Sequence, residues 1–339
     1  MRVGTAWADI TPDRPLPLLG QMHRRIPRHT HDPLTANAVA FDDGSARAVL
    51  VSCDLCFMPH ELARRVQAAC AERLDVDGRA VLLAATHTHL GPATAPFASD
   101  APDEAYLARL EAVLVEVVGR TVEDLAEAEL LAGAGWLDEM GFNRRGLHAD
   151  GRADMYHGSW NADFAGVEGP RDGEVGVLFA RTADGAVKAV VSSFSTHPNS
   201  VEGECFFGAD VPGSVRRVLR GALGEDVGVV YLTGAAGNTA PSIMVDNPRN
   251  VQPWRGEQGW RRSGWYLGGE ILKVLAAAHQ PMDRPPLRLA AGELAIPMRP
   301  WPEDFQPARK WSEGPWRDYY LANQADWPRL LAGDYSRGP

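Results

Sequence analysis

Three histidines that follow strand-like runs are the residues of this sequence best suited to chemistry. The apolar run 81–85 leads into His87 and His89, and the run 187–194 leads into His197. Side chains alternate in direction along an extended segment, so the two imidazoles of the H-x-H pair share one face. Neutral imidazole is a common metal ligand, and a catalytic zinc needs three protein ligands and one open position. The three histidines are therefore candidate metal ligands. Ordinary hydrogen-bonded histidines at strand ends are the alternative.

Other polar residues stand in loops that we expect to surround the same site. The run 227–233 leads into a glycine-rich loop that contains Asn238, and the run 49–51 is followed by Asp54. In open α/β sheets ligands bind outside the carboxyl ends of the strands, which is where these loops begin. Arg144 lies in a further polar segment, and its guanidinium could hold a substrate carbonyl or carboxylate. A solvated surface arginine is the alternative interpretation.

The cysteines indicate packing and not redox chemistry. Cys53 and Cys56 form a C-x-x-C, but a thioredoxin-like motif opens a helix, whereas Cys53 ends a run typical of a buried strand. Four cysteines in 339 residues are also too few for the disulfide framework of a small secreted domain. We therefore expect thiols that pack as small apolar side chains.

Short runs rich in Val, Leu and Ala alternate with longer amphipathic stretches, which predicts an α/β protein. We expect layered mixed β-sheets with flanking helices and a site at the carboxyl ends of the strands. No internal repeat is visible. Residues 1–298 form one predicted domain, and 299–339 form a tail rich in proline and tryptophan. The expected strands are 46–52, 81–85, 175–180, 187–194 and 227–233, and the expected helices are 60–74, 103–127, 211–223 and 265–279.

The charge balance excludes several classes of partner. Lys and Arg total 34 against 44 Asp and Glu, a net charge of −10, so no broad electrostatic contact with nucleic acid or an anionic membrane is expected. No run of 18 apolar residues occurs, so no transmembrane segment is expected. The opening residues lack the apolar stretch of a signal peptide, and we expect a cytoplasmic protein whose partner is a small molecule. The oligomeric state stays open.

Five motifs, in one order and at similar spacing, resemble the neutral/alkaline ceramidase family, in particular its amino-terminal catalytic domain. The resemblance covers residues 1 to about 280. The motifs are Gly4 to Pro12 (G-x-x-x-x-D-I-T-P), followed by Leu19-Gly20; Thr86 to Pro92, similar to H-T-H-S-G-P; Asn143-Arg144, similar to N-R-S; His197 with Gly208 to Gly213 downstream, similar to the second metal-histidine loop; and Gly234 to Pro241, similar to G-x-x-G-D-x-S-P.

The resemblance implies a zinc amidase whose family substrate is an N-acyl sphingoid base. At the matching positions His87 and His197 are the implied zinc ligands, His89 faces the reacting carbonyl, and Arg144 positions or stabilises it. Asn238 replaces the acidic residue of the last motif and is counted with His89 and Arg144 among the candidate catalytic residues. The expected substrate is a small soluble amide or ester, or a lipid amide.

The chain departs from the family pattern at two points. Ala240 stands where the family has its functional serine, and no match to the family's later glutamate and tyrosine ligands precedes Pro339. Either those ligands lie beyond this sequence, or a carboxylate such as Asp54 or Asp210 completes the site.

We therefore predict a zinc-dependent hydrolase that cleaves an amide or ester bond with a metal-activated water, because position 240 offers no hydroxyl. His89 and Arg144 would stabilise charge on the carbonyl oxygen, where one donor contributes about 3 kcal/mol. The alternative is a non-catalytic member of the same fold that binds a metal or another ligand. A metal-dependent phosphoesterase would need more carboxylates than these loops offer.

Overall fold

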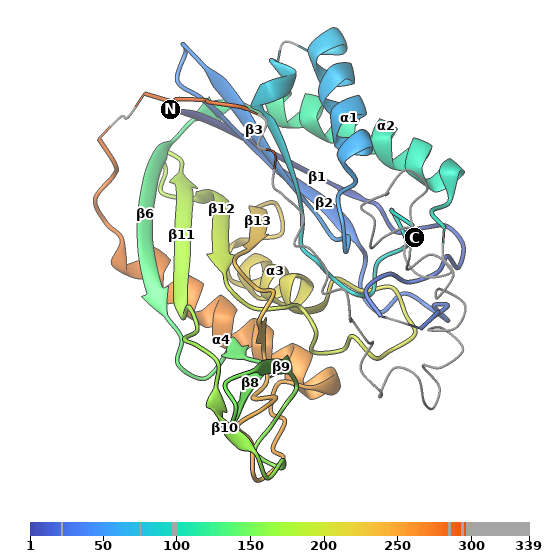
Figure 1. Cartoon of the computed structure of the whole chain (residues 1–339). Coiled ribbons are helices and arrows are strands. Elements are labelled where there is room, and N and C mark those ends of the chain that lie inside the picture. The colour runs from blue at the N-terminus through green and yellow to red at the C-terminus, as the bar shows by residue number, and fades with distance from the viewer. Residues whose placement is uncertain (22, 75, 97–100, 284–285, 293–294, 296–339) are drawn as a thin grey trace.

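The chain folds into two β-sheets that pack face to face, each covered on its outer face by a pair of helices (Figure 1). The apolar layer between the sheets combines side chains of both, among them Val39 of the first and Val230 of the second. This arrangement confirms the predicted α/β class with layered mixed sheets and flanking helices. The computed structural model describes residues 1–21, 23–74, 76–96, 101–283, 286–292 and 295. The predicted tail, 299–339, lies outside the described residues.

The amino-terminal third of the chain builds the first sheet. Its elements are β1 (Arg2–Asp9), β2 (Thr35–Asp42), β3 (Arg47–Cys53), α1 (His60–Arg73), η1 (Gly78–Ala80), β4 (Val81–Ala85), α2 (Glu104–Glu123) and β5 (Ala126–Glu127). The strand order is β4-β3-β2-β1-β5. Neighbouring strands are antiparallel except β3 and β4, which run parallel because α1 carries the chain back across the sheet. α1 and α2 pack on the outer face in one apolar cluster with β2 and β3.

The second sheet follows the same plan. Its elements are β6 (Glu129–Trp136), β11 (Glu174–Arg181), β12 (Val187–Phe194), α3 (Asp210–Leu223), β13 (Gly228–Thr233) and α4 (Gly256–Ala277). The strand order is β13-β12-β11-β6, with β12 and β13 parallel and the other pairs antiparallel. α3 is the crossover between the parallel strands, and α3 and α4 cover the outer face.

One order of elements therefore occurs twice. The series β1-β2-β3-α1-β4-α2 and β6-β11-β12-α3-β13-α4 have the same strand neighbours and directions. The expectation of no internal repeat is wrong at the level of topology. It rested on residue identity, whereas the order of a sheet depends on which faces each segment buries, and different apolar residues satisfy that requirement equally well.

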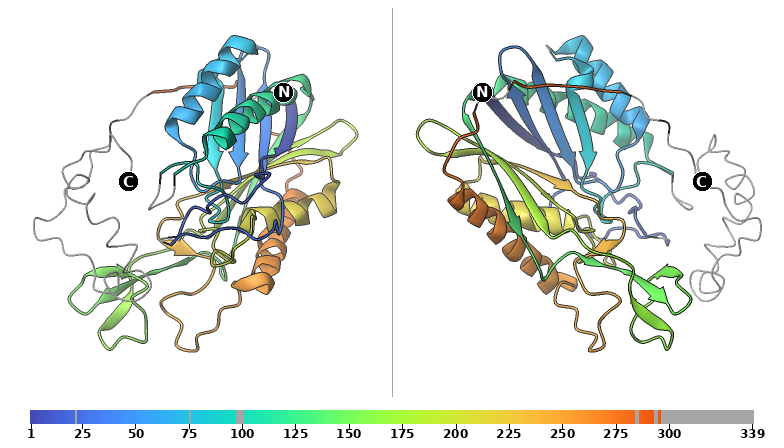
Figure 2. Two further views of the ribbon diagram at one scale, coloured as in Figure 1. Left: turned by 90° about the vertical axis from the view of Figure 1, so that its right-hand side faces the viewer. Right: turned by 60° about the vertical axis from the view of Figure 1, so that its left-hand side comes forward.

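Five short strands complete the described fold. β7 (Phe142–Asn143) pairs with β14 (Thr239–Ala240), and this pair joins the segment after β6 to the loop after β13. A small sheet of order β10-β8-β9 projects beyond the end of β6, in the lower part of Figures 1 and 2. Its strands are β8 (Arg145–His148), β9 (Ala153–Met155) and β10 (Phe164–Val167).

The apolar runs predicted most of the central elements. β4 and β12 have the predicted bounds, β13, α1 and α3 differ from theirs by one residue at one end, and β3 and β11 differ by one residue at both ends. α2 ends four residues early because 126–127 pair with β1, and α4 begins nine residues early at Gly256. Among the described helices, none combines the length and apolar character needed to cross a bilayer.

β6 shows why some strands escaped the sequence pattern. It contains Gly133 and Gly135, which weaken a strand signal. A Cβ on Gly133 would lie 2.8 Å from Val274 Cγ1, and one on Gly135 would lie 2.3 Å from Glu270 Oε1. The glycines therefore allow α4 to pack closely on this strand.

The cysteines of the C-x-x-C are buried and unpaired, as expected. Burial raises the pKa of both the Cys53 and the Cys56 thiols, to about 12 for Cys56. A thiol that stays protonated at neutral pH is a poor nucleophile and redox centre.

Candidate metal centre

The loops after β4 and β12 bring three imidazoles together although they leave different sheets. His87 and His89 belong to the first loop, and His197 belongs to the second. The Nε2 atom of His89 lies 3.4 Å from that of His87 and 3.0 Å from that of His197. The rings stand nearly perpendicular to one another, with interplanar angles of 80° to 90°. The three candidate ligands are thus neighbours in space.

The Nδ1 atom of each ring faces a hydrogen-bond acceptor. The acceptors are the carbonyl oxygen of Cys56 at 2.8 Å for His87, a carboxylate oxygen of Glu202 at 3.1 Å for His89, and the carbonyl oxygen of Ala236 at 3.2 Å for His197. Each acceptor favours the neutral tautomer that carries its proton on Nδ1. The Nε2 atom of every ring is then left with a lone pair.

Three lone pairs that converge repel one another unless a proton or a cation lies among them. In tetrahedral coordination with Zn–N bonds of about 2.0–2.1 Å, ligand nitrogens stand about 3.3 Å apart. The Nε2 atom of His89 lies 3.4 Å from that of His87 and 3.0 Å from that of His197, and both separations are close to that value. Imidazoles whose other nitrogen donates to a carbonyl or carboxylate are also typical of zinc sites. The donor set fits a zinc ion.

Burial favours the neutral form of two of these imidazoles, His197 and His87. Burial, together with the neighbouring Arg144 guanidinium and the other two rings, lowers the pKa of His197 to about 3. Burial is also the largest influence on His87, whose pKa is lowered as well. A neutral imidazole is the form that binds a metal ion, so His87 and His197 need no deprotonation to bind one at neutral pH.

Hydrogen bonds between the sheets hold the first loop in place. The Thr233 hydroxyl donates to the carbonyl of Thr86 at 2.7 Å, and the Ser52 hydroxyl donates to the carbonyl of Tyr231 at 2.6 Å. His87 itself has a φ of 67°, in the left-handed region that few non-glycine residues adopt. The chain turns sharply there as it leaves β4.

The opening segment of the chain packs against His89. Gly20 has a φ of +104°, and a Cβ on it would lie 2.4 Å from His89 Cγ. Glycine is required at this position both by the positive φ and by the lack of space for a Cβ. Arg25 is buried and was not among the candidate residues, and it donates to the His89 carbonyl at 2.6 Å. The Leu19-Gly20 motif thus packs against His89 and helps to hold it in place.

Glu202 is the carboxylate that sequence reasoning missed. Its Oε2 atom accepts from His89, and its Oε1 atom accepts from Asn199 at 3.2 Å and from Arg255 at 3.1 Å. Burial raises the pKa of this carboxyl, but the hydrogen bond with His89 and the charge of Arg255 outweigh burial and hold it at about 2. Glu202 is therefore an ionised acceptor. Its position five residues after His197 was the only sequence signal.

Arg144 is buried beside the imidazoles, so the surface interpretation is wrong. Its Nη1 atom donates to the Tyr156 hydroxyl at 3.0 Å, and its Nη2 atom donates to the Gly237 carbonyl at 3.0 Å. The same Nη2 atom lies 3.4 Å from His197 Nδ1. The Nε atom is buried without a hydrogen-bond partner. Among the described residues nothing accepts the Nε–H of Arg144, so this donor is open to a ligand.

Asn238 and Ala240 act on Arg144 through the backbone. The Asn238 carbonyl accepts the Arg144 N–H at 2.8 Å, and Ala240 pairs with Phe142 in the β7–β14 ladder. Ala240 is completely buried. The segment that carries the family's serine position therefore aligns β7, the strand directly before Arg144.

Asp54 does not complete the metal site, contrary to one sequence-based expectation. It is fully buried, forms an ion pair with Arg216, and accepts the N–H and hydroxyl of Thr35 at 2.8 and 2.9 Å. These partners belong to β2 and α3, and they occupy the carboxylate. Asp54 links the helix of one sheet to a strand of the other.

Asp210 does not complete the site either. It begins α3, and its carboxylate accepts the N–H groups of Ser200, Val201 and Val211 at 2.8 to 3.1 Å. Burial raises the pKa of Asp210 to about 7. The residue fixes the turn after His197 against α3 and presents no oxygen to the histidines.

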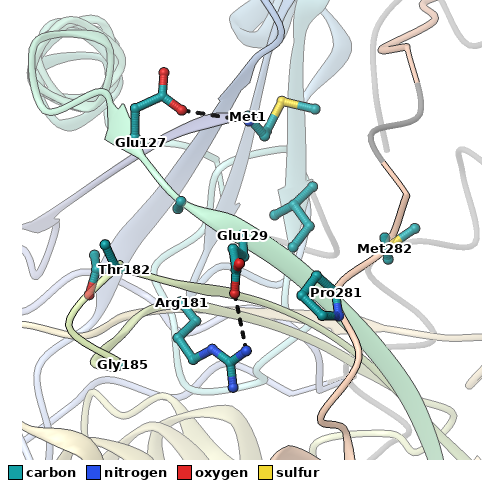
Figure 3. A pocket seen from close by; sticks show the side chains of 11 residues that line it. Met1, Glu127, Glu129, Arg181, Thr182, Gly185, Pro281 and Met282 are labelled. Atoms are coloured by element: carbon teal, nitrogen blue, oxygen red, sulfur yellow. Dashed lines mark hydrogen bonds and ion pairs between the residues drawn. The ribbon is translucent and has the colours of Figure 1, made fainter.

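A cavity of about 490 Å³ lies at the other end of the second sheet (Figure 3). The turn between β11 and β12 lines it, whereas His197 follows the opposite end of β12. Its charged groups pair with one another: Arg181 with Glu129 at 3.1 Å, and the Met1 amino group with Glu127 at 3.9 Å. Its lining contains no imidazole or thiol. The cavity is therefore separate from the candidate metal centre.

The comparison with solved structures decides the fold family. The structure titled as neutral ceramidase from Pseudomonas aeruginosa superposes with a TM-score of 0.68 at 22% sequence identity over 83% of this chain. The chain has a neutral ceramidase-like fold. A structure titled as ceramidase complexed with C2 matches this neutral ceramidase-like domain with a TM-score of 0.66, also at 22% identity over 83% of the chain. The likeness confirms, for the fold, the resemblance found in the motifs.

The domain spans less than half of those two chains, 45% and 44%. No family model matches the sequence, and no curated protein is significantly similar to it.

Proposed function

We propose that this neutral ceramidase-like domain is a zinc-dependent hydrolase that cleaves the amide bond of an N-acyl compound, with an ester as the related substrate. The observation that carries the proposal is the convergence of three imidazole Nε2 atoms beside the buried Arg144. Two solved structures of the same fold are titled as ceramidases, which supports a lipid amide as the substrate class.

His87 and His197 would hold the zinc ion, and His89 would be the third nitrogen ligand. The resemblance places His89 beside the metal, facing the substrate carbonyl. The carboxylate of Glu202, however, favours a proton on His89 Nδ1, and a neutral ring in that tautomer has no proton on Nε2 to donate to a carbonyl oxygen. Three ligands and one open position are the arrangement of a catalytic zinc site. A bound zinc ion would act as a Lewis acid and would lower the pKa of the water bound to it to about 7.

Arg144 is the proposed donor to the carbonyl oxygen. Its Nε–H is buried without an acceptor, while its two Nη atoms are held by Tyr156 and Gly237. A substrate oxygen could accept from the free donor as negative charge develops on it, and one such donor contributes about 3 kcal/mol to the transition state. Asn238 is a positioning residue, because its backbone carbonyl fixes the Arg144 N–H.

Water is the proposed nucleophile, because position 240 carries alanine. Ala240 is buried and paired with Phe142, and its side chain offers no hydroxyl. The water oxygen bonds to the carbonyl carbon, the C–N bond breaks, and the amine leaves with a proton. The missing hydroxyl also favours a second candidate function, in which a protein of this fold binds a metal ion but catalyses no reaction.

The test is hydrolysis of N-acyl sphingosine and of short-chain N-acyl amides by protein freed of metal with a chelator. We expect activity only after zinc is restored, and none in the His87→Ala, His197→Ala double variant. Zinc binding without turnover on amides or esters of any chain length would favour the non-catalytic candidate. Equal turnover with and without metal would contradict both.

A further inference from the structure

A second pair of imidazoles lies in the small β10-β8-β9 sheet, outside the metal centre described above. His148 ends β8, His157 follows β9, and Asp163 directly precedes β10. The two imidazole rings stack with their centroids 3.6 Å apart and their planes 16° apart. One possible ligand atom from each of the three residues lies within 4.8 Å of the other two. Two nitrogens and a carboxylate oxygen are thus close enough to share one ion.

His157 has a buried nitrogen that makes no hydrogen bond to any described residue. Its side chain is only 9% exposed, and its Nε2 atom has no hydrogen-bond partner. Asp163 Oδ1 lies 3.4 Å from that atom without the alignment of a hydrogen bond. Buried polar atoms are normally paired, so an orphaned imidazole nitrogen facing a carboxylate points to a missing ligand.

Two carboxylates flank His148, and Arg152 lies 4.0 Å from one of them, Asp154. His148 lies between two carboxylates, with Nδ1 2.7 Å from Asp163 and Nε2 3.0 Å from Asp154. The Asp163 and Asp154 side chains are about half exposed, at 53% and 61%, whereas His148 is 12% exposed. The carboxylates are therefore more exposed than the partly buried imidazoles, which gives an ion a path of entry.

The backbone holds the two rings together. A Cβ on Gly146 would lie 1.8 Å from the carbonyl oxygen of His157. Only glycine therefore lets the segment after β9 pack directly against β8. Tyr156 directly precedes His157. Its hydroxyl accepts a hydrogen bond from Arg144, and its backbone N–H donates to the Arg144 carbonyl at 2.9 Å.

We propose that His148, His157 and Asp163 bind a second divalent ion, for which zinc is the best match, and that this ion is structural. Two imidazoles and a carboxylate suit zinc among the common divalent ions. The ion would take the place of the proton that His148 shares with Asp163. It would join β8 to the segments beside β9 and β10, and so fix Tyr156 against Arg144.

The test counts zinc ions in metal-free protein after titration with Zn²⁺ and removal of excess, by elemental analysis. We expect two ions per chain in the wild type and one in the His87→Ala, His197→Ala variant. Adding His157→Gln or Asp163→Asn to that double variant should remove the remaining ion or weaken its binding at least tenfold. Asp150→Asn, at an exposed carboxylate in the turn after β8, is the matched control and should keep it.

A second measurement locates the ion. In the His87→Ala, His197→Ala variant, Zn²⁺ should slow amide hydrogen exchange over residues 145–167 and leave the two large sheets unchanged. The proposal is overturned if this variant binds no zinc, or if His157→Gln and Asp163→Asn leave its affinity unaltered. The proposed catalytic site is independent of that outcome, because the His157→Gln variant of the wild type would still bind one ion there.

Discussion

The Nε2 atoms of His89 and His197 lie 3.0 Å apart although 108 residues separate the two positions. Each ring turns its Nδ1 atom to an acceptor, the Glu202 carboxylate for His89 and the Ala236 carbonyl for His197. In the tautomers that carry the proton on Nδ1, the two Nε2 atoms approach each other with lone pairs, and an ion between them would relieve this repulsion. The contact also joins the loops of two different sheets, so an ion here would link both halves of the fold.

The metal content of single histidine variants tests the ligand set. His87→Ala, His197→Ala and His89→Ala should each lower zinc affinity strongly, because each removes one of three nitrogens. Elemental analysis after dialysis against a weak chelator measures this. His279→Ala, an exposed histidine at the end of α4, is the control and should keep full zinc. If the His89 variant keeps its zinc but loses turnover, His89 is not a ligand. It would then have the role that the family resemblance implies, facing the reacting carbonyl.

Replacing Arg144 should reduce turnover without removing zinc. Arg144→Lys keeps the charge but loses the fork of donors, so kcat/KM should fall about 100-fold. Zinc content should match the wild type, because Arg144 contacts His197 only at Nδ1. Arg145→Lys is the neighbouring control, since Arg145 pairs with Glu168 on the small sheet. An unchanged kcat/KM in Arg144→Lys would remove Arg144 from the mechanism.

Glu202→Gln should weaken zinc binding about 10- to 100-fold, the usual effect of losing the partner of a metal-bound histidine. The amide can present an N–H to His89 Nδ1 and no longer fixes the ring tautomer. Competition with a chromophoric chelator gives the affinity. Glu204→Gln, at an exposed side chain two residues later, should bind zinc as the wild type does. Equal affinities in the two variants would show that Glu202 does not orient His89.

Asp54→Asn should destabilise the fold by about 3–5 kcal/mol, because Arg216 would keep a buried charge without its partner. Urea unfolding of the metal-free protein measures the loss. Asp226→Asn, at an exposed position, should change the free energy of unfolding by less than about 0.5 kcal/mol. Zinc stoichiometry should stay the same in the refolded Asp54 variant. A loss of zinc there would restore Asp54 as a ligand.

Asp210 should make stability fall as pH rises. Burial raises its folded-state pKa to about 7, above the ordinary value of 3.8, so the folded state binds more protons between these two values. The stabilising contribution is complete below about pH 4 and is lost by about pH 7, at roughly 1.4 kcal/mol per pH unit. Asp210→Asn should remove this slope from the unfolding free energy of metal-free protein. Identical slopes in variant and wild type would contradict the assignment.

The residue types of the candidate site and the strands that carry it could be read from the sequence. Apolar runs bounded by polar residues predicted β4 and β12 to the residue. His87 follows the first run by a few positions, and His197 follows the second. This worked because strand burial is encoded locally. The motifs also indicated the family of the fold, which the solved structures confirm.

Only the tertiary structure decided which polar groups meet. Asp54 looked like a metal ligand from its place after β3, but Arg216, 162 residues away, occupies it. Glu202 and Arg25 support His89 without any motif of their own. A buried polar group takes its partner from whatever the packed sheets bring within about 3 Å, and that depends on how distant loops are juxtaposed. No local pattern in the sequence records such a meeting.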